Sequence, residues 1–264
     1  MNILKKLLKP LGGSKLDTYL AREQFARRNI VFLHVQKTGG SSFWHAFSKA
    51  LNSNPSLNYG VMDAHHVANQ VFGDVECSYK ALQVIASKSV DFRLSRMIVH
   101  YHSPFGDVTN LIYNPLIIMC IRSPLQRMRS GFRHWRKLNP KQKNPQVFFE
   151  YDSAFGINYF LAGCLPYDLS PLSTPPDFFI DYIKKNVFFI SLNDYKSRSA
   201  KIKFLEKQLR IPEIEPFIYS KTITDKSFDK ELDFLLSNDA DFSSEWKKML
   251  DMEVLWHKRL HLDV

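Results

Sequence analysis

A short glycine-containing segment, QKTGGSS, joins an apolar run to a helix-like stretch and holds the residue types that bind phosphate. Gly39 and Gly40 let the backbone turn tightly and approach a ligand closely. The N-terminus of a following helix offers unpaired N–H groups and a partial positive charge, and Lys37 adds a mobile cation. Hydroxyl donors come from the other members of the segment: Thr38, Ser41 and Ser42. The segment predicts a phosphate cradle, with a plain glycine-rich turn as the alternative. It is not the pattern G-x-x-x-x-G-K-S/T, because here the lysine precedes the glycines.

A second segment, LIIMCIRSPLQRMRSGFRHW, places Arg122 at the end of an apolar run and the start of a helix. Ser130 follows about two helical turns later, near the same face of that helix. A guanidinium and a hydroxyl so placed could hold one phosphate. Four further arginines surround them, and some should form a solvated basic face, Arg129 and Arg136 first. The four are Arg127, Arg129, Arg133 and Arg136.

A third segment, MIVHYHSPFGDV, carries two histidines at alternate positions, His100 and His102. In an extended chain these two side chains point the same way. Histidine is suited to proton abstraction near neutral pH. A structural hydrogen-bonded pair is one alternative. A His-x-His metal site is another, although no third ligand is obvious nearby. His65 and His66 are expected at the surface or at the rim of a substrate site.

The elements that must position these residues follow from the apolar pattern. Apolar runs at 30–35, 97–100, 116–121 and 187–190 predict strands buried on both faces. Helices are expected at 15–27, 43–51, 124–138, 153–163, 193–209 and 242–260, with polar breaks at 52–60, 139–146 and 171–176. The alternation predicts an α/β fold with a mostly parallel central sheet flanked by helices. Ligands in such folds bind beyond the carboxyl ends of the strands, where the three segments lie.

Length and composition predict a domain with a sizeable core. The chain has 264 residues, of which 45% are hydrophobic and 23% charged. We expect one domain over 28–264, preceded by a basic segment with a leading helix over 1–27. The net charge of +10 suits anionic partners, namely nucleotide phosphates, nucleic acid, acidic glycans or membrane, and does not choose among them. Three cysteines without zinc-site spacing favour a reducing compartment, with Cys120 an inert core residue.

Targeting signals are weak in this sequence. No run approaches the ~20 apolar residues of a membrane span, and the start, MNILKKLLKPLGG, has too short an apolar core for a signal peptide. We therefore expect a cytoplasmic protein without a transmembrane segment. The N-terminus could touch a membrane surface as a short amphipathic turn, although a frayed basic terminus is the favoured interpretation.

Two of these segments resemble one enzyme family. HVQKTGGSSF resembles the 5′-phosphosulfate loop of the heparan sulfate 2-O- and 6-O-sulfotransferase group, and IRSPLQRMRSGFRHW resembles its 3′-phosphate motif. Both occur in the family's order, about 85 residues apart. MIVHYHSPFGDV resembles its histidine segment, and 159–170 is loosely similar to the 6-O-type enzymes. One departure is Ser123, where the family has Asp; serine also caps helices well.

The resemblance implies a P-loop-NTPase-like sulfotransferase fold and the donor 3′-phosphoadenosine 5′-phosphosulfate (PAPS), without a metal. By this resemblance His102 is the catalytic base, His100 has a supporting or substrate-binding role, and Lys37 stabilises the leaving phosphate oxygen. A late loop, YSKTITDKSF, should close over the nucleotide. The implied donor-binding residues are Lys37, Thr38, Gly39, Gly40, Ser41, Ser42, Arg122, Ser130, Ser220, Lys221 and Thr222.

The resemblance also implies a carbohydrate acceptor and no nucleic-acid partner, while the acceptor's identity, the position sulfated and the oligomeric state stay open. One rival is a P-loop-type kinase or other NTPase acting on a small molecule. It would need Mg²⁺ and usually an Asp at a strand end, where this sequence has Arg122. The other rival is a non-enzymatic basic module that binds glycan or nucleic acid, which leaves the KTGGSS segment unexplained.

Overall fold

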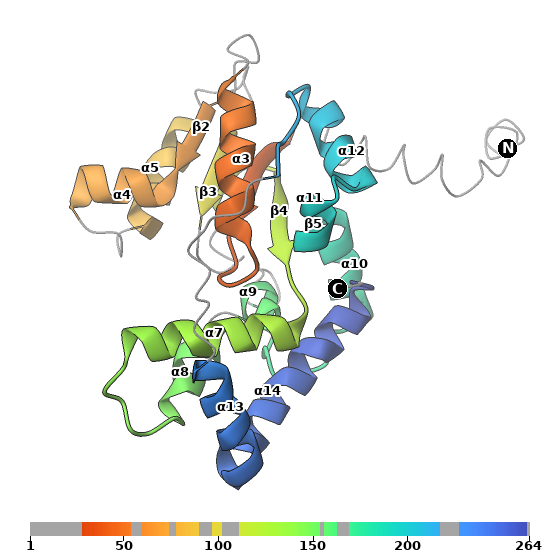
Figure 1. Ribbon diagram of the computed structural model, residues 1–264. Coiled ribbons are helices and arrows are strands. Elements are labelled where there is room, and N and C mark those ends of the chain that lie inside the picture. Colours follow the sequence, from red (N-terminus) through yellow and green to blue (C-terminus); the bar gives the residue numbers. More distant parts are fainter. Residues whose placement is uncertain are drawn as a thin grey trace, which may run out of the picture.

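A five-stranded sheet forms the centre of the computed structural model (Figure 1). The structure describes residues 28–53, 60–73, 78–89, 97–101, 111–153, 156–162, 169–216 and 227–262. Within these residues the strands are β1 (Asn29–Leu33), β2 (Gly60–Asp63), β3 (Met97–Tyr101), β4 (Pro115–Ile121) and β5 (Val187–Ser191). They lie in the order β2-β3-β1-β4-β5, and every neighbouring pair is parallel. The predicted α/β class with a parallel sheet is confirmed.

The sheet is buried on both faces because its central strands are apolar at every position. In β1, Ile30 and Phe32 belong to the core of one face, and Val31 and Leu33 belong to the core of the other. All four side chains are fully buried. Such continuous apolar strands are typical of parallel sheets covered by helices on both sides. The four predicted strands are confirmed to within two residues at either end.

Helices cover both faces of this sheet. α3 (Gly40–Asn52), α11 (Leu192–Lys196) and α12 (Ala200–Leu209) pack on one face. The opposite face is covered by α4 (Ala64–Phe72), α5 (Ser78–Ser89), α9 (Ile157–Ala162), α10 (Asp177–Asn186) and the C-terminal part of α14 (Ala240–Arg259). Each layer buries an apolar stripe of its helices, as expected of a three-layer α/β domain.

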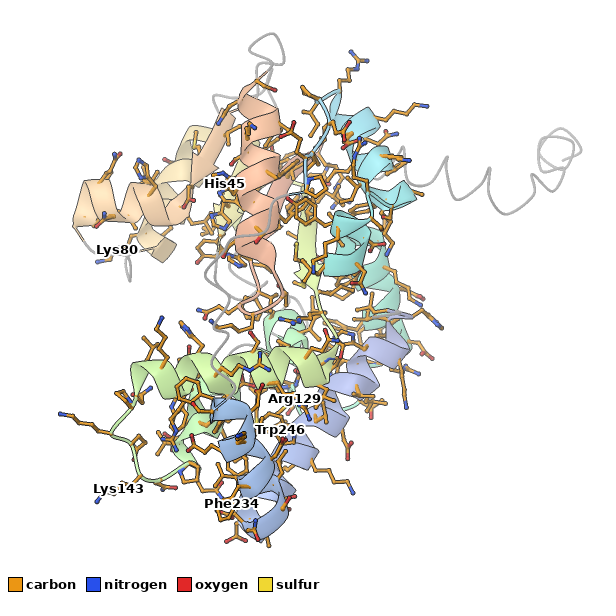
Figure 2. All side chains as sticks on the ribbon, in the orientation of Figure 1. His45, Lys80, Arg129, Lys143, Phe234 and Trp246 are labelled. Atoms are coloured by element: carbon orange, nitrogen blue, oxygen red, sulfur yellow. The ribbon has the colours of Figure 1, made fainter. Side chains whose placement is uncertain are left out.

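A further group of helices lies beyond the carboxyl end of β4, where α7 (Pro124–Leu138) crosses below the strands (Figure 1). It comprises α7, α8 (Val147–Ser153), α13 (Ser227–Asn238) and the N-terminal part of α14, and it has its own aromatic core. Trp246 is buried inside this group, whereas Phe234 is exposed on the outer side of α13 (Figure 2). The helical group therefore packs as a separate cluster beside the carboxyl ends of the strands, outside the three layers of the sheet and its helices.

A buried ionic cluster joins three of these helices. Arg127 of α7 donates to both carboxylate oxygens of Asp152 on α8, at 3.0 and 2.8 Å, and to those of Glu253 on α14, at 2.9 to 3.0 Å. All three side chains are at most 3% exposed. Gly131 leaves the space that Asp152 occupies, since a Cβ there would lie 2.3 Å from Asp152 Oδ1. The cluster therefore ties α8 and α14 to α7.

Several predicted elements differ from those observed. The single helix expected over 193–209 is two helices, α11 and α12, because a residue with positive φ, Arg198, interrupts it. The helix expected over 153–163 corresponds to the end of α8 and to α9. β2, α4, α5, α10 and α13 were not predicted, and the helix expected over 15–27 lies outside the described residues.

Two smaller expectations concern Cys120 and the membrane. Cys120 is buried in the core, and burial raises the pKa of its thiol, as expected of an inert cysteine. Among the residues that the structure describes, no helix combines the length and apolar character that a membrane span requires.

Candidate functional site

The strand order places the two predicted phosphate segments side by side. β1 lies between β3 and β4, and the chain reverses its direction of winding at this point of the sheet. In open α/β sheets, ligands bind in the crevice beyond the carboxyl ends of the strands at such a reversal. The loop after β1 carries Lys37 to Gly40, and Arg122 directly follows β4. The crevice is therefore bordered by these two segments.

The loop after β1 takes a strained path that its sequence permits. Lys37 and Gly39 have positive φ angles of 64° and 88°. Glycine adopts this conformation without cost, whereas Lys37 holds it at some energetic expense. The Thr38 hydroxyl donates to the Val35 carbonyl at 2.7 Å, and its side chain is buried. Thr38 therefore uses its hydroxyl hydrogen to stabilise the loop.

α3 begins at Gly40, directly after this loop. The N–H groups of its first turn therefore lie at the end of the helix that borders the crevice. The first turn of α3, all of which the structure describes, holds no acidic side chain. Ser41 is exposed and Ser42 is half-buried. The N-terminus of this 13-residue helix has no side-chain cap, and the N–H groups and dipole of such a terminus favour an anion.

Arg122 lies against the segment QKTGGSS (36–42), which the sequence predicts to bind phosphate and which is called the phosphate loop below. Its Nη1 is 3.5 Å from the Lys37 carbonyl oxygen, although the two residues are 85 positions apart in sequence. Its Nε contacts Gln126 Oε1 at 3.3 Å. Ser130 lies further along α7 and is half-buried. The structure thus brings the Lys37 loop and the start of α7 together, as the two sequence motifs predict.

The cations of this region are partly removed from water. Burial lowers the pKa of Lys37 from its ordinary value to about 8, with the charge of Asp152 opposing that shift. Burial, the charge of Lys37 and the charge of Lys137 lower the pKa of His134 on α7. Burial, followed by the charge of Arg133, lowers the pKa of Arg122. Positive groups from both segments therefore repel one another here, and a bound anion would relieve that repulsion.

The remaining arginines of α7 do not form a single solvated face. Arg129 is exposed, as predicted (Figure 2). Arg136 was also expected at the surface, and this is wrong: its side chain is 12% exposed and pairs with Glu231 on α13. Arg133 pairs with Asp229 in the first turn of α13, at 2.6 and 2.9 Å. Acidic residues of α13 therefore hold two of these arginines in place.

His100 is buried and has partners at both ring nitrogens. Its Nδ1 lies 2.7 Å from Asp63 Oδ2, and its Nε2 lies 3.4 Å from His34 Nδ1. The ring stacks against Trp44, with centroids 4.5 Å apart and planes 14° from parallel. His34 in turn approaches the start of α3, where its Nε2 lies 3.4 Å from Ser41 Oγ. A line of polar groups thus joins β2 to the phosphate loop.

Two residues of this line, His34 and Asp63, were not singled out as site residues in the sequence. Asp63 directly precedes α4 and accepts from the His66 backbone N–H through Oδ1, at 3.2 Å, as a helix N-cap does. That capping pattern was the available signal, because an Asp precedes the periodic run AHHVANQVF. His66 is exposed, in agreement with the sequence prediction.

Several predicted site residues cannot be placed. His102 and the late-loop residues Ser220, Lys221 and Thr222 lie outside the described residues, as does the side chain of His65. Among the residues that the structure does describe, no group of three or more His, Cys, Asp or Glu side chains is arranged to hold a metal ion. The roles of His102 and of the late loop stay predictions.

Comparison with known proteins adds one similarity. No family model and no curated protein match the chain. Among solved structures, the fold is similar to that of the mouse sulfotransferase SULT7A1 complexed with PAP, with a TM-score of 0.36 and 16% sequence identity. The match covers 81% of this chain and 68% of that one. A TM-score and an identity of this size do not indicate a function.

Proposed function

We propose that this protein is a sulfotransferase that moves the sulfuryl group of PAPS to a hydroxyl, with a carbohydrate as acceptor. The observation that carries the proposal is the contact between Arg122 and the Lys37 carbonyl across 85 residues of sequence. This contact supports the proposal because the two segments that we expect to bind phosphate then border one crevice of the sheet. A donor with phosphates at two positions, as in PAPS, requires such a pair. The family resemblance of both segments supports the same donor.

The proposed chemistry uses residues of the chain alone. N–H groups of Gly39 to Ser42 hold the 5′-phosphate, and Arg122 with Ser130 holds the 3′-phosphate. The acceptor oxygen attacks sulfur while the bond from sulfur to the 5′-phosphate oxygen breaks. Lys37 stabilises the charge that develops on that leaving oxygen, and His102 takes the acceptor's proton. Catalysis then rests on positioning and electrostatic stabilisation, as in phosphoryl transfer.

The 3′-phosphate gives the first test. PAP (adenosine 3′,5′-bisphosphate), the product that remains after sulfuryl transfer, should bind the protein and raise its melting temperature. Arg122→Ala removes a charge-assisted contact with the 3′-phosphate, so PAP should bind about 10- to 100-fold more weakly. Adenosine 5′-phosphosulfate, which lacks that phosphate, should bind Arg122→Ala and the wild type equally. Titration calorimetry measures all four combinations.

Arg129→Ala is the matched control for this test, because Arg129 lies on the same helix and is exposed. It should leave the affinity for PAP unchanged. If Arg122→Ala lost affinity for PAP and for adenosine 5′-phosphosulfate equally, Arg122 would not contact the 3′-phosphate. A transfer assay with and without EDTA separates the kinase alternative, since transfer that is lost on chelation and restored by Mg²⁺ would contradict the metal-free scheme. Binding of glycan without any transfer would favour the non-enzymatic module.

Lys37 predicts how donor affinity depends on pH. With a pKa of about 8, Lys37 is half neutral at that pH in the free protein. A phosphate binds the charged form of Lys37. At pH values where Lys37 of the free protein is neutral, binding should therefore be accompanied by uptake of a proton. PAP affinity should therefore fall as pH rises above 8, by up to about tenfold per pH unit. Lys37→Arg should hold its affinity over this range, because arginine stays charged.

Calorimetry at pH 8.5 in two buffers of different ionisation enthalpy measures the proton directly. The wild type should take up a fraction of a proton on binding PAP, and Lys37→Arg should take up less. The phosphates of PAP do not confound this result, since phosphate monoesters are fully ionised well below pH 8. If the two proteins take up the same number of protons, Lys37 does not contact the donor.

A further inference from the structure

We propose that Asp63, His100 and His34 form a hydrogen-bonded relay that positions the start of α3, and that Asp63 is its orienting residue. The relay runs from the end of β2, through β3 and the residue after β1, to Ser41 on the phosphate loop. Its three contacts are 2.7, 3.4 and 3.4 Å long. Both histidines are 6% exposed, so the middle of the relay is buried, whereas Asp63 at one end is half-buried and Ser41 at the other end is exposed.

When both rings are neutral, the carboxylate at one end of the relay fixes its direction. An ionised carboxylate can only accept, so His100 Nδ1 must carry a hydrogen toward Asp63. In neutral His100, Nε2 then accepts, which requires His34 Nδ1 to carry a hydrogen. Neutral His34 therefore accepts at Nε2, and the Ser41 hydroxyl is the donor. Every contact is satisfied when both rings are in the Nδ1–H form.

The surroundings hold each member in place. Trp44 stacks on the His100 ring, and Phe32 stacks on it with centroids 5.5 Å apart. Asp63 is held by the His66 N–H through its other oxygen. Gly40 makes room for His34, because a Cβ at this position would lie 2.3 Å from His34 Cδ2. The second glycine of the phosphate loop is thus explained by the relay, whereas the first is explained by its positive φ.

The relay assigns roles that the sequence left open. With both ring nitrogens engaged, His100 is a positioning residue. The Ser41 hydroxyl hydrogen faces His34, so Ser41 serves the phosphate site through its backbone N–H. Asp63 acts on the loop from the edge strand without touching the donor. The statement about phosphate rests on the proposed function, whereas the direction of the relay does not.

Nuclear magnetic resonance of ¹⁵N-labelled histidine rings tests the direction without any assay of activity. At pH about 8 the wild type should show His34 and His100 with hydrogen on Nδ1 and bare Nε2. In Asp63→Asn the amide oxygen can keep the cap of α4 while its NH₂ faces His100. His100 must then move its hydrogen to Nε2, and His34 must follow. Both rings should therefore switch to the Nε2–H form.

One further variant and a reference ring distinguish a switch along the relay from a general structural change. Ser41→Ala removes the last donor, so only His34 Nε2 should shift, with both rings staying in the Nδ1–H form. The exposed His45 on α3 serves as the reference ring and should not respond in either variant (Figure 2). Wild-type rings in the Nε2–H form, or charged rings, would overturn the proposal. So would a His34 that does not respond to Asp63→Asn.

PAP affinity tests the consequence for the donor site. Ser41→Ala keeps the backbone N–H that we assign to the phosphate and removes only the hydroxyl that we assign to His34, so the loss of PAP affinity should be about twofold or less. A loss of tenfold or more would show that the hydroxyl faces the nucleotide, and would overturn this part. If the wild type itself fails to bind PAP, the proposed function is wrong, and the ring spectra still decide the direction of the relay.

Discussion

Replacing His102 with alanine should lower turnover by about 10²- to 10⁴-fold, the contribution of a general base that reaches the acceptor hydroxyl. In the sequence His102 is the next residue after β3, and by the family resemblance it matches the catalytic histidine. PAP affinity should stay nearly unchanged, since the proposed contacts to phosphate come from other residues. Steady-state transfer kinetics and PAP calorimetry on the same variant measure both quantities.

The comparison with His100→Ala makes this test decisive. His100 already contacts Asp63 and His34 through its two ring nitrogens, so its loss should cost less than that of His102. In the wild type the rate should also fall at acidic pH, as the base becomes protonated. If His100→Ala abolishes turnover while His102→Ala retains it, the two roles must be exchanged. If neither matters in a folded protein, the base lies elsewhere.

The part of the site that could be predicted from sequence is the part encoded by local pattern. A Gly-Gly segment between an apolar run and a helix predicted the tight loop after β1, and an arginine after another apolar run predicted a cation directly after β4. That these groups bind phosphate stays a prediction. Each signal lies within about ten residues. That Arg122 contacts the Lys37 loop follows from both being at strand ends, because parallel strands bring their carboxyl ends to one edge.

The relay could not be predicted because Asp63, His100 and His34 lie at or just after the ends of three strands, and local sequence does not reveal the order of those strands in the sheet. His34 and His100 become neighbours only because β1 and β3 pair in parallel. β2 itself, GVMD, is four residues long and half-buried, so its apolar pattern is too weak to mark a strand. Because β2 was not predicted, the position of Asp63 at its end could not be predicted either.

The burial of Arg127 also could not be predicted from the sequence. Its sequence context, a helix with five arginines including Arg122 just before it, suggests solvent or a ligand. The structure buries Arg127 between two carboxylates that arrive from residues 152 and 253. Burial alone would lower the pKa of Arg127, but the charges of Glu253 and Asp152 outweigh burial and raise it. Only tertiary packing decides which arginine of a basic helix becomes structural.

Arg127→Met should therefore destabilise the protein strongly, lowering the free energy of unfolding by about 3–5 kcal/mol. Methionine fills much of the same space, so the loss comes from leaving the buried carboxylates of Asp152 and Glu253 without their cation. Urea unfolding of wild type and variant at pH 7 measures it. Arg129→Met, on the exposed side of the same helix, should change stability by less than about 0.5 kcal/mol.

The pH dependence of this loss distinguishes the unpaired charge from poorer packing. Burial raises the pKa of Asp152, and in the wild type its contact with Arg127 opposes that shift. Without Arg127 the folded-state pKa of Asp152 rises further above its unfolded value, so the folded variant binds more protons than the unfolded chain. Its stability should then increase relative to wild type as pH falls from 7 to 5. A deficit that stays constant over this range would mean that the introduced methionine packs badly and that the charges of the cluster are not the cause. The triple variant Arg127→Met, Asp152→Leu, Glu253→Leu removes every buried charge of the cluster, and it should recover part of the stability that Arg127→Met alone loses.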